Sequence, residues 1–338
     1  MQPPNGVTGW NPPQIASIVV DVYRVTPSHR EIETAFLKTI RNAKISMEKT
    51  TPHSPALLDV LNRLTGGDVT VDEAASLIAL AQPNSADANR IADGLLQIDG
   101  ATVDLGRQQR CGFGEVIYGE GKSSELIVNV IRAQLDAGQS SLVTRIDPTT
   151  ASQVRRSFDH TLHNPVARTL RVASEPIAAS EPVPADELDQ TFHVAVVTAG
   201  STDLPAAEEA AETLGWMGIR IQRYDDIGVA GPQRLLASAG ALRQANAVVV
   251  VAGMEGALPA SVGGHVPCPV FAVPTSIGYG TNLGGLTPLM GMLCSCAPNV
   301  AVVNVDAGFK GGYLAGLVTH QLIQVAESVS TSVSEPSS

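Results

Sequence analysis

"NAVVVVAG", residues 246–253, is a continuous apolar run that ends in glycine and is too short to span a membrane. Such a run is typical of a strand that is buried on both faces of a parallel sheet. Further strand-like segments at 193–200, 219–226, 269–276 and 300–306 alternate with helix-like segments. Five strands alternating with helices predict a parallel sheet covered on both faces, which is a flavodoxin-like three-layer α/β sandwich.

The 338 residues are enough for about two domains. We assign residues 191–328 to the sandwich and residues 56–172 to a smaller N-terminal α/β domain. Between them, residues 173–190 carry three prolines and an acidic bias without periodicity, which predicts a linker. The proline-rich residues 1–55 are expected to be a mobile or accessory extension, and residues 329–338 a disordered tail.

The N-terminal domain has weaker patterns. Residues 54–67 and 70–82 predict two short amphipathic helices. After them, "EVIYG", a helix over 123–137 and "SLVTRI" predict a small βαβ unit. The last part is expected to add a helix at "VRRSFDHTL", residues 154–162, and a third strand at "ARTLRVAS", residues 167–174.

Composition excludes several classes of function. The formal net charge of −11, without a long cluster of Lys and Arg, disfavours binding to nucleic acid. No apolar run is long enough to span a membrane, and no secretory signal is visible, so the expected location is cytoplasmic. Charged residues make up only 16% of the chain, against roughly 25% in an average domain. Part of the surface is therefore expected to be buried in a homo-oligomer.

Ligands of such sheets bind beyond the carboxyl ends of the strands. "TAGSTD", residues 198–203, follows the first strand and opens a helix, so its free N–H groups and side chains suit an anion such as a phosphate. The alternative is an ordinary, well-capped turn. The G-x-G-x-x-G fingerprint of dinucleotide folds is missing. The candidate binding residues of this loop are Gly200, Ser201, Thr202 and Asp203.

Two more loops follow strands at the same edge. In "AGMEGALP", residues 252–259, burial would make Glu255 a usable base near neutral pH, or Glu255 only favours the start of a helix. "VPTSIGYGTNLGG", residues 273–285, has many glycines that let the backbone approach a ligand closely. The candidate binding residues of the two loops are Gly253, Met254, Gly256, Thr275, Ser276, Gly278 and Asn282.

Four cysteines in a reducing compartment are expected to be free thiols. Cys294 and Cys296 make a weak metal signal, because no second pair stands at metal-ligand spacing. On a helix ending near residue 297 their side chains point about 200° apart, so at most one faces a site. Packing is the commonest role for such a cysteine. If one is functional, Cys296 is nearer the crevice, and a thiolate there, deprotonated by Glu255, would be a nucleophile.

These motifs, in this order, resemble the LarB family, the pyridinium-3,5-biscarboxylic acid mononucleotide synthases of nickel-pincer nucleotide cofactor biosynthesis. The resemblance covers roughly residues 55–325 and includes "VDLGRQQRCGFGEVIYGEGKS", residues 103–123, and "GGLTPLMGMLCSCA", residues 284–297. LarB is related to PurE, the aminoimidazole ribonucleotide carboxylase or mutase. PurE has a glycine-serine-x-serine-aspartate loop, which "GSTD" in this chain resembles. The chain differs from PurE in having "GMEGALP" in place of an alanine-histidine pair and in its cysteine motif.

The resemblance implies a carboxylase that is also a hydrolase. Its substrates would be nicotinic acid adenine dinucleotide (NaAD) and CO2 or bicarbonate, and its products the biscarboxylate mononucleotide and AMP. By match to the family motif Cys296 is the nucleophile and Glu255 accepts its proton, while Cys294 packs. Asp203 with Ser201 would hold the ribose phosphate or act near the ring.

The resemblance also implies a homo-octamer, and Thr275, Ser276 and Asn282 would line its pockets. Tyr118, Glu120 and Lys122 of "GFGEVIYGEGKS" would cover a neighbouring subunit's site, or form only a structural turn. No cofactor is firmly implied, although Mg²⁺ beside carboxylates such as Asp306 could assist phosphoanhydride cleavage. Two other functions stay open: a PurE-like carboxylase of a purine precursor, and a nucleotide-binding regulatory module without catalysis.

Overall fold

The computed structural model describes residues 63, 90–91, 94–178, 182–184 and 186–333. All described residues from Arg90 onward belong to one compact unit. The predictions of an extension over 1–55 and of two helices within 54–82 lie outside the described residues, apart from Arg63. No helix in the described part of the chain is long and apolar enough to cross a membrane.

The C-terminal domain, residues 193–333, is built on a five-stranded sheet in which every pairing is parallel. The strands are β8 (His193–Thr198), β9 (Arg220–Tyr224), β10 (Ala247–Ala252), β11 (Val270–Pro274) and β12 (Val300–Val302). Their order, β12-β11-β10-β8-β9, is the flavodoxin-like order, which confirms the predicted fold. The chain reverses direction across the sheet between β8 and β10, where such folds place their ligands.

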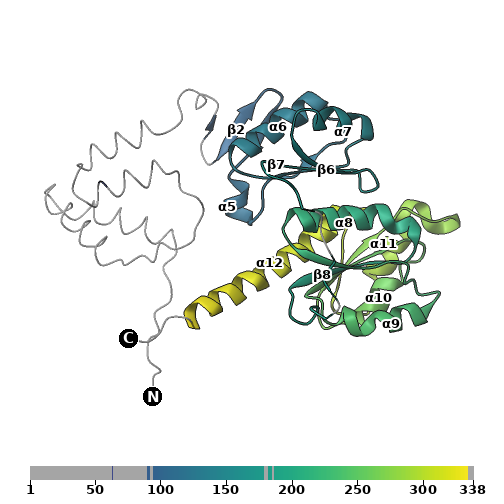
Figure 1. Ribbon diagram of the computed structural model, residues 1–338. Helices are drawn as coiled ribbons and strands as arrows, with labels where there is room; N and C mark the ends of the chain where they lie inside the picture. Colours follow the sequence, from purple (N-terminus) through teal and green to yellow (C-terminus); the bar gives the residue numbers. More distant parts are fainter. Residues whose placement is uncertain (1–62, 64–89, 92–93, 179–181, 185, 334–338) are drawn as a thin grey trace, which may run out of the picture. The chain divides into compact units, whose positions relative to one another are not determined.

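Helices cover both faces of this sheet (Figure 1). α8 (Leu204–Trp216) and α12 (Gly308–Val333) pack on one face, and α9 (Pro232–Leu242), α10 (Leu258–Gly263) and α11 (Leu286–Leu293) contribute to the core on the other. Side chains alternate along each strand, so Val194 and Val196 face the first layer while Ala195 and Val197 face the second. Each fully buried valine contributes about 1.5–3 kcal/mol.

The N-terminal α/β domain, residues 94–174, contains a four-stranded mixed sheet in the order β4-β5-β7-β6. Its strands are β4 (Ile117–Tyr118), β5 (Ser141–Thr144), β6 (His160–Asn164) and β7 (Thr169–Ala173). The helices are α5 (Arg107–Cys111), α6 (Ser124–Asp136) and α7 (Pro148–Arg155). A second, antiparallel sheet contains β1 (Arg90–Ile91), β2 (Leu95–Ile98) and β3 (Ala101–Asp104).

Two predictions at element ends were wrong. The helix expected over 154–162 is instead the end of α7 followed by β6, because Asp147 caps a helix that starts at Pro148 and β6 pairs antiparallel with β7. The tail was expected to be disordered from residue 329, yet α12 continues to Val333. Within the segment assigned as a linker, Val183 and Leu188 are buried, and Pro182 forms a parallel bridge with Ile221 at the sheet edge.

Candidate functional site

A cavity of about 200 Å³ lies beyond the carboxyl ends of β8 and β11. The N-terminal domain supplies part of its wall from the ends of β5 and β7, and α8 and the turn after β12 supply the rest. The charged and hydroxyl side chains that line it include Arg145, Arg168, Asp203, Glu209, Thr275 and Asp306.

Asp203 is the buried carboxylate of this cavity, with 4% of its surface exposed. Thr275 Oγ1 donates a hydrogen bond to Asp203 Oδ1 (2.8 Å), and the backbone N–H of Gly200 donates to Oδ2 (3.0 Å). Burial raises the pKa of Asp203 above its ordinary value, although both hydrogen bonds oppose the shift. A carboxyl group held in this way can keep a proton at a higher pH than an exposed aspartate does.

Close backbone contacts fix the loop after β10 against the loop after β11. A Cβ on Gly253 would lie 2.4 Å from the carbonyl oxygen of Ile277 and 2.6 Å from Thr275 Oγ1. Met254 has a φ of 54° and donates its N–H to the same carbonyl, and Gly256 has a φ of 73°. Residue 253 therefore has to be glycine for a steric reason.

Arg145 and Glu209 tie the N-terminal domain to the C-terminal domain at the cavity. Arg145 Nε donates to Glu209 Oε1 at 2.9 Å, and its Nη2 donates to Glu209 Oε2 at 3.3 Å and to the carbonyl oxygen of Asp306. Phe309 N–H also donates to Glu209 (3.1 Å). Burial raises the pKa of Glu209, and the charge of Arg145 opposes that shift. Asp306 in turn accepts a hydrogen bond from the N–H of Ser276 (2.8 Å).

The other predicted binding residues surround the same edge. Thr202 and Ser276 are exposed residues that line the cavity, and Ser201 is exposed beside them in the 3₁₀ turn η2 (Ser201–Asp203). Asn282, in η3 (Gly280–Gly285), is buried and donates from Nδ2 to the carbonyl oxygen of Ser276 (3.0 Å). A Cβ on Gly278 would lie 2.4 Å from that amide nitrogen.

The structure differs from the prediction in the exposure of Glu255 and in where the helix before the two cysteines ends. Glu255 is exposed, so the burial expected for a base is not present in this chain. α11 ends at Leu293, which leaves Cys294 at its C-cap and Cys296 beyond it, and both thiols are exposed. The expectation that a helix ending near residue 297 carries both cysteines was therefore wrong, and the exposed Cys294 is not packed within this chain as expected.

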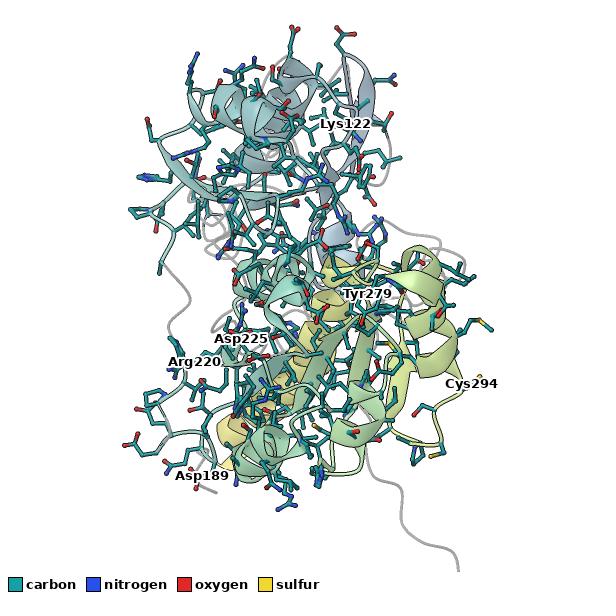
Figure 2. All side chains as sticks on the ribbon, turned by 90° about the vertical axis from the view of Figure 1, so that its right-hand side faces the viewer. Lys122, Asp189, Arg220, Asp225, Tyr279 and Cys294 are labelled. Atoms are coloured by element: carbon teal, nitrogen blue, oxygen red, sulfur yellow. The ribbon has the colours of Figure 1, made fainter. Side chains whose placement is uncertain are left out.

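The chain also turns away from the cavity before Cys296. β12 begins at Val300, which pairs with Val270, the first residue of β11, so the preceding segment leads to the amino edge of the sheet. Cys296 does not line the cavity around Asp203. Figure 2 shows Tyr279 and Cys294 on one side of the C-terminal domain, with Tyr279 nearer the N-terminal domain.

The glycine-rich motif of the N-terminal domain places three side chains at the edge of the mixed sheet. Tyr118 pairs with Thr144, the residue before Arg145. Its hydroxyl donates to Glu120 (2.7 Å), which raises the pKa of Tyr118, and Lys122 donates to the Tyr118 carbonyl oxygen (2.8 Å).

Sequence reasoning missed Arg145, Arg168 and Glu209. The two arginines have φ values of 55° and 54°, a conformation that is uncommon for residues other than glycine and that no sequence motif marks. The described residues contain no group of three or more His, Cys, Asp or Glu side chains that could hold a metal ion. The suggestion of Mg²⁺ beside Asp306 therefore stays a prediction.

Two family models match the chain, one over each domain. A family model described as the LarB/PurE-like N-terminal domain matches residues 95–174, and one described as AIR carboxylase matches residues 193–335. An uncharacterized protein of Methanocaldococcus jannaschii is 33% identical over 270 residues, which cover 78% of this chain and 96% of that protein. A crystal structure of a PurE2 variant from Treponema denticola is 18% identical, with a TM-score of 0.32, over 42% of this chain and 94% of that one.

The fold and the two matched domains thus define a carboxylase-related protein of the PurE superfamily. Within that superfamily, the chain belongs to the LarB family.

Proposed function

We propose that this protein is a carboxylase and hydrolase that converts NaAD and CO2 or bicarbonate to pyridinium-3,5-biscarboxylic acid mononucleotide and AMP. The observation that carries the proposal is the match of residues 95–174 to the LarB/PurE-like N-terminal domain beside an AIR carboxylase match over residues 193–335, together with the motif "CSCA" at residues 294–297. The exposure of the Cys296 thiol supports it further, because a nucleophile must be reachable by its substrate.

A covalent step explains why a cysteine is needed. The pyridinium ring is electron-poor, so its C5 does not attack CO2. Addition of the Cys296 thiolate at C4 forms a carbon–sulfur bond and leaves a dihydropyridine whose C5 is enamine-like. C5 then attacks CO2; loss of the C5 proton and expulsion of the thiolate restore the aromatic ring. By the match to the family motif we assign Glu255, exposed beyond the carboxyl end of β10, to take the proton of Cys296. Within one subunit the segment that carries Cys296 leads to the opposite edge of the sheet, so this structure forms no direct contact between the two groups.

The second half of the reaction is hydrolysis. Water adds to the phosphoanhydride, one P–O bond breaks, and AMP and the mononucleotide separate. Because the substrate is a dinucleotide, its ring and its phosphates can contact different parts of the protein. We assign Asp203 and Ser201 to the ribose phosphate side, where Asp203 is buried and its pKa is raised.

We further propose a homo-octamer. The surface that supports it is apolar and surrounds η3 and α11, next to the two cysteines. Its exposed members include Tyr279, Leu283, Leu286, Met290 and Leu293, which are between 48% and 81% exposed. Exposed apolar patches of this kind usually mark subunit interfaces. Light scattering coupled to size exclusion would measure the mass of the assembly.

The test of the activity is direct. Purified protein is mixed with NaAD and bicarbonate, and mass spectrometry follows the gain of one carboxyl group and the release of AMP. The match to AIR carboxylase over residues 193–335 favours a second candidate, a PurE-like carboxylase, so aminoimidazole ribonucleotide is assayed in parallel. A LarB-type enzyme converts the first substrate and rejects the second, whereas a regulatory module binds nucleotide and releases no product.

A further inference from the structure

Arg168 is a cation on the cavity wall that has no ionic partner in the described part of the chain. Its side chain donates from Nη2 to the carbonyl oxygen of Arg145 (3.3 Å). A guanidinium has five N–H donors, so most of its hydrogen-bonding capacity is unused. Arg168 is half-buried, and a partly desolvated charge without a counter-ion is unfavourable unless a ligand supplies one.

The carboxylates around the cavity already have partners. Glu209 is paired with Arg145. Asp203 accepts hydrogen bonds at both of its oxygens, and Asp306 accepts one from a backbone N–H. The charge of Arg168 is therefore not compensated by direct contact with any of them.

The backbone holds Arg168 in place at a conformational cost. Arg168 and Arg145 both have positive φ values, and the N–H of Ile146 donates to the carbonyl oxygen of Arg168 (2.9 Å). The turn before Arg168 is fixed to α8, because Asn164 Nδ2 donates to Glu208 at 2.8 Å. Residues in sparsely populated backbone conformations cluster at ligand sites, where the surrounding structure maintains these conformations.

We propose that Arg168 binds an oxyanion of the substrate in this cavity. Its planar fork matches the two oxygens of a phosphate or of a carboxylate. Thr202 and Ser276, which line the same cavity, carry hydroxyl groups that can donate to the same oxyanion. This inference rests on the proposed function and extends it, because it gives the N-terminal domain a direct part in binding NaAD.

The test measures dissociation constants by calorimetry for NaAD and for NAD, in which a carboxamide replaces the ring carboxylate. The variants are Arg168→Asn, Arg168→Lys and, as the matched control, Arg132→Asn on the exposed side of α6. Asparagine tolerates positive φ, so Arg168→Asn should fold with an unchanged melting temperature. We expect it to weaken NaAD binding about 10- to 100-fold, Arg168→Lys less, and Arg132→Asn less than twofold.

The two ligands separate the two sources of the oxyanion. Equal weakening for NaAD and NAD identifies a phosphate, and weakening for NaAD alone identifies the ring carboxylate. Unchanged NaAD affinity in Arg168→Asn, with a wild-type protein that binds and carboxylates NaAD, would overturn the assignment of Arg168 and leave the proposed function standing. A wild-type protein that neither binds nor converts NaAD would overturn both. If Arg168→Asn does not fold, Arg168→Gly, which also accepts a positive φ and removes the charge, replaces it in the same test.

Discussion

The guanidinium of Arg145 forms an ion pair with the carboxylate of Glu209, with 2.9 Å between Nε and Oε1. Arg145 lies in the region that matches the LarB/PurE-like N-terminal domain, and Glu209 lies in the region that matches AIR carboxylase. The Glu209 side chain is only 3% exposed. The pair therefore joins the two domains at the cavity, and removing its cation would leave a buried carboxylate without compensation.

We expect Arg145→Ala to lower the free energy of unfolding by about 3 kcal/mol, measured by urea denaturation. Adding Glu209→Gln should recover part of that loss, because the double variant has no buried charge to compensate. The control is Arg220→Ala, which removes a pair with Glu187 that is 3.6 Å long and roughly half exposed. It should cost less than about 1 kcal/mol. Equal losses in Arg145→Ala and Arg220→Ala would show that the Arg145–Glu209 pair does not stabilise the fold.

Asp203 should make the stability of the fold depend on pH. Burial raises its folded-state pKa above the ordinary value of 3.8, so the folded protein holds this proton more tightly than the unfolded chain. The resulting stabilisation is fully present below pH 3.8 and is lost as the pH rises through the raised folded pKa. Asp203→Asn cannot titrate, so it should remove this fall, although it lacks one of the two acceptor oxygens and should be less stable than the parent at low pH. The melting temperatures of the two proteins between pH 4 and 8 measure this fall. If both melting temperatures change in parallel with pH, burial does not raise the pKa of Asp203.

Gly253 should tolerate no side chain. A Cβ there would lie 2.4 Å from the Ile277 carbonyl oxygen, so Gly253→Ala must displace the loop after β11. We expect a loss of about 1–3 kcal/mol in the free energy of unfolding and a weaker affinity for NaAD. Gly240→Ala is the matched control, because nothing lies within 4 Å of its Cβ on α9; it should stabilise the protein by about 0.5–1 kcal/mol. Similar outcomes for both variants would contradict the close packing described for this loop.

The cysteines should differ in their reaction with iodoacetamide. Cys111, Cys294 and Cys296 are exposed, whereas Cys268 is buried and its pKa is raised to about 11. In the folded protein at pH 8 the first three should be alkylated and Cys268 protected, as read by peptide mass spectrometry. Under the proposed function, NaAD should slow alkylation of Cys296 and leave that of Cys111 unchanged. Rapid labelling of Cys268 would contradict the burial, and equal slowing at both sites would contradict specific protection.

The strands of the parallel sheet and helix α6 could be predicted, because short stretches of sequence mark them. The apolar runs around Val196 and Val249 mark buried parallel strands, and Ser123 marks the start of α6, where its hydroxyl accepts a hydrogen bond from the N–H of Leu126. The β2–β3 hairpin carries a local signal too, because Asp99-Gly100 between two strands is typical of a two-residue turn. β6 could not be recognised in this way, because "HTLHN" is only half-buried and gains its pairing from β7.

The site was less predictable, for a physical reason. Asp203 and Thr275 were found because each follows a strand of the parallel sheet, whereas their hydrogen bond, which spans β10, is defined only by the tertiary structure. Arg145 and Arg168 reach the cavity from a different domain, through positive φ values and a contact with α8 that only tertiary structure defines. The place of Cys296 was misjudged because the end of α11, and not the sequence spacing, decides which way it lies.

The central claim is that the sulfur of Cys296 carries the carboxylation of a pyridinium ring. Its most direct test incubates wild-type protein, Cys294→Ala and Cys296→Ala with NaAD and ¹³C-bicarbonate and follows the label in the mononucleotide by mass spectrometry. We predict labelled product and AMP from the wild type, much of that activity from Cys294→Ala, and no labelled product from Cys296→Ala. Labelled product from Cys296→Ala, or equal loss in the two variants, would contradict the account.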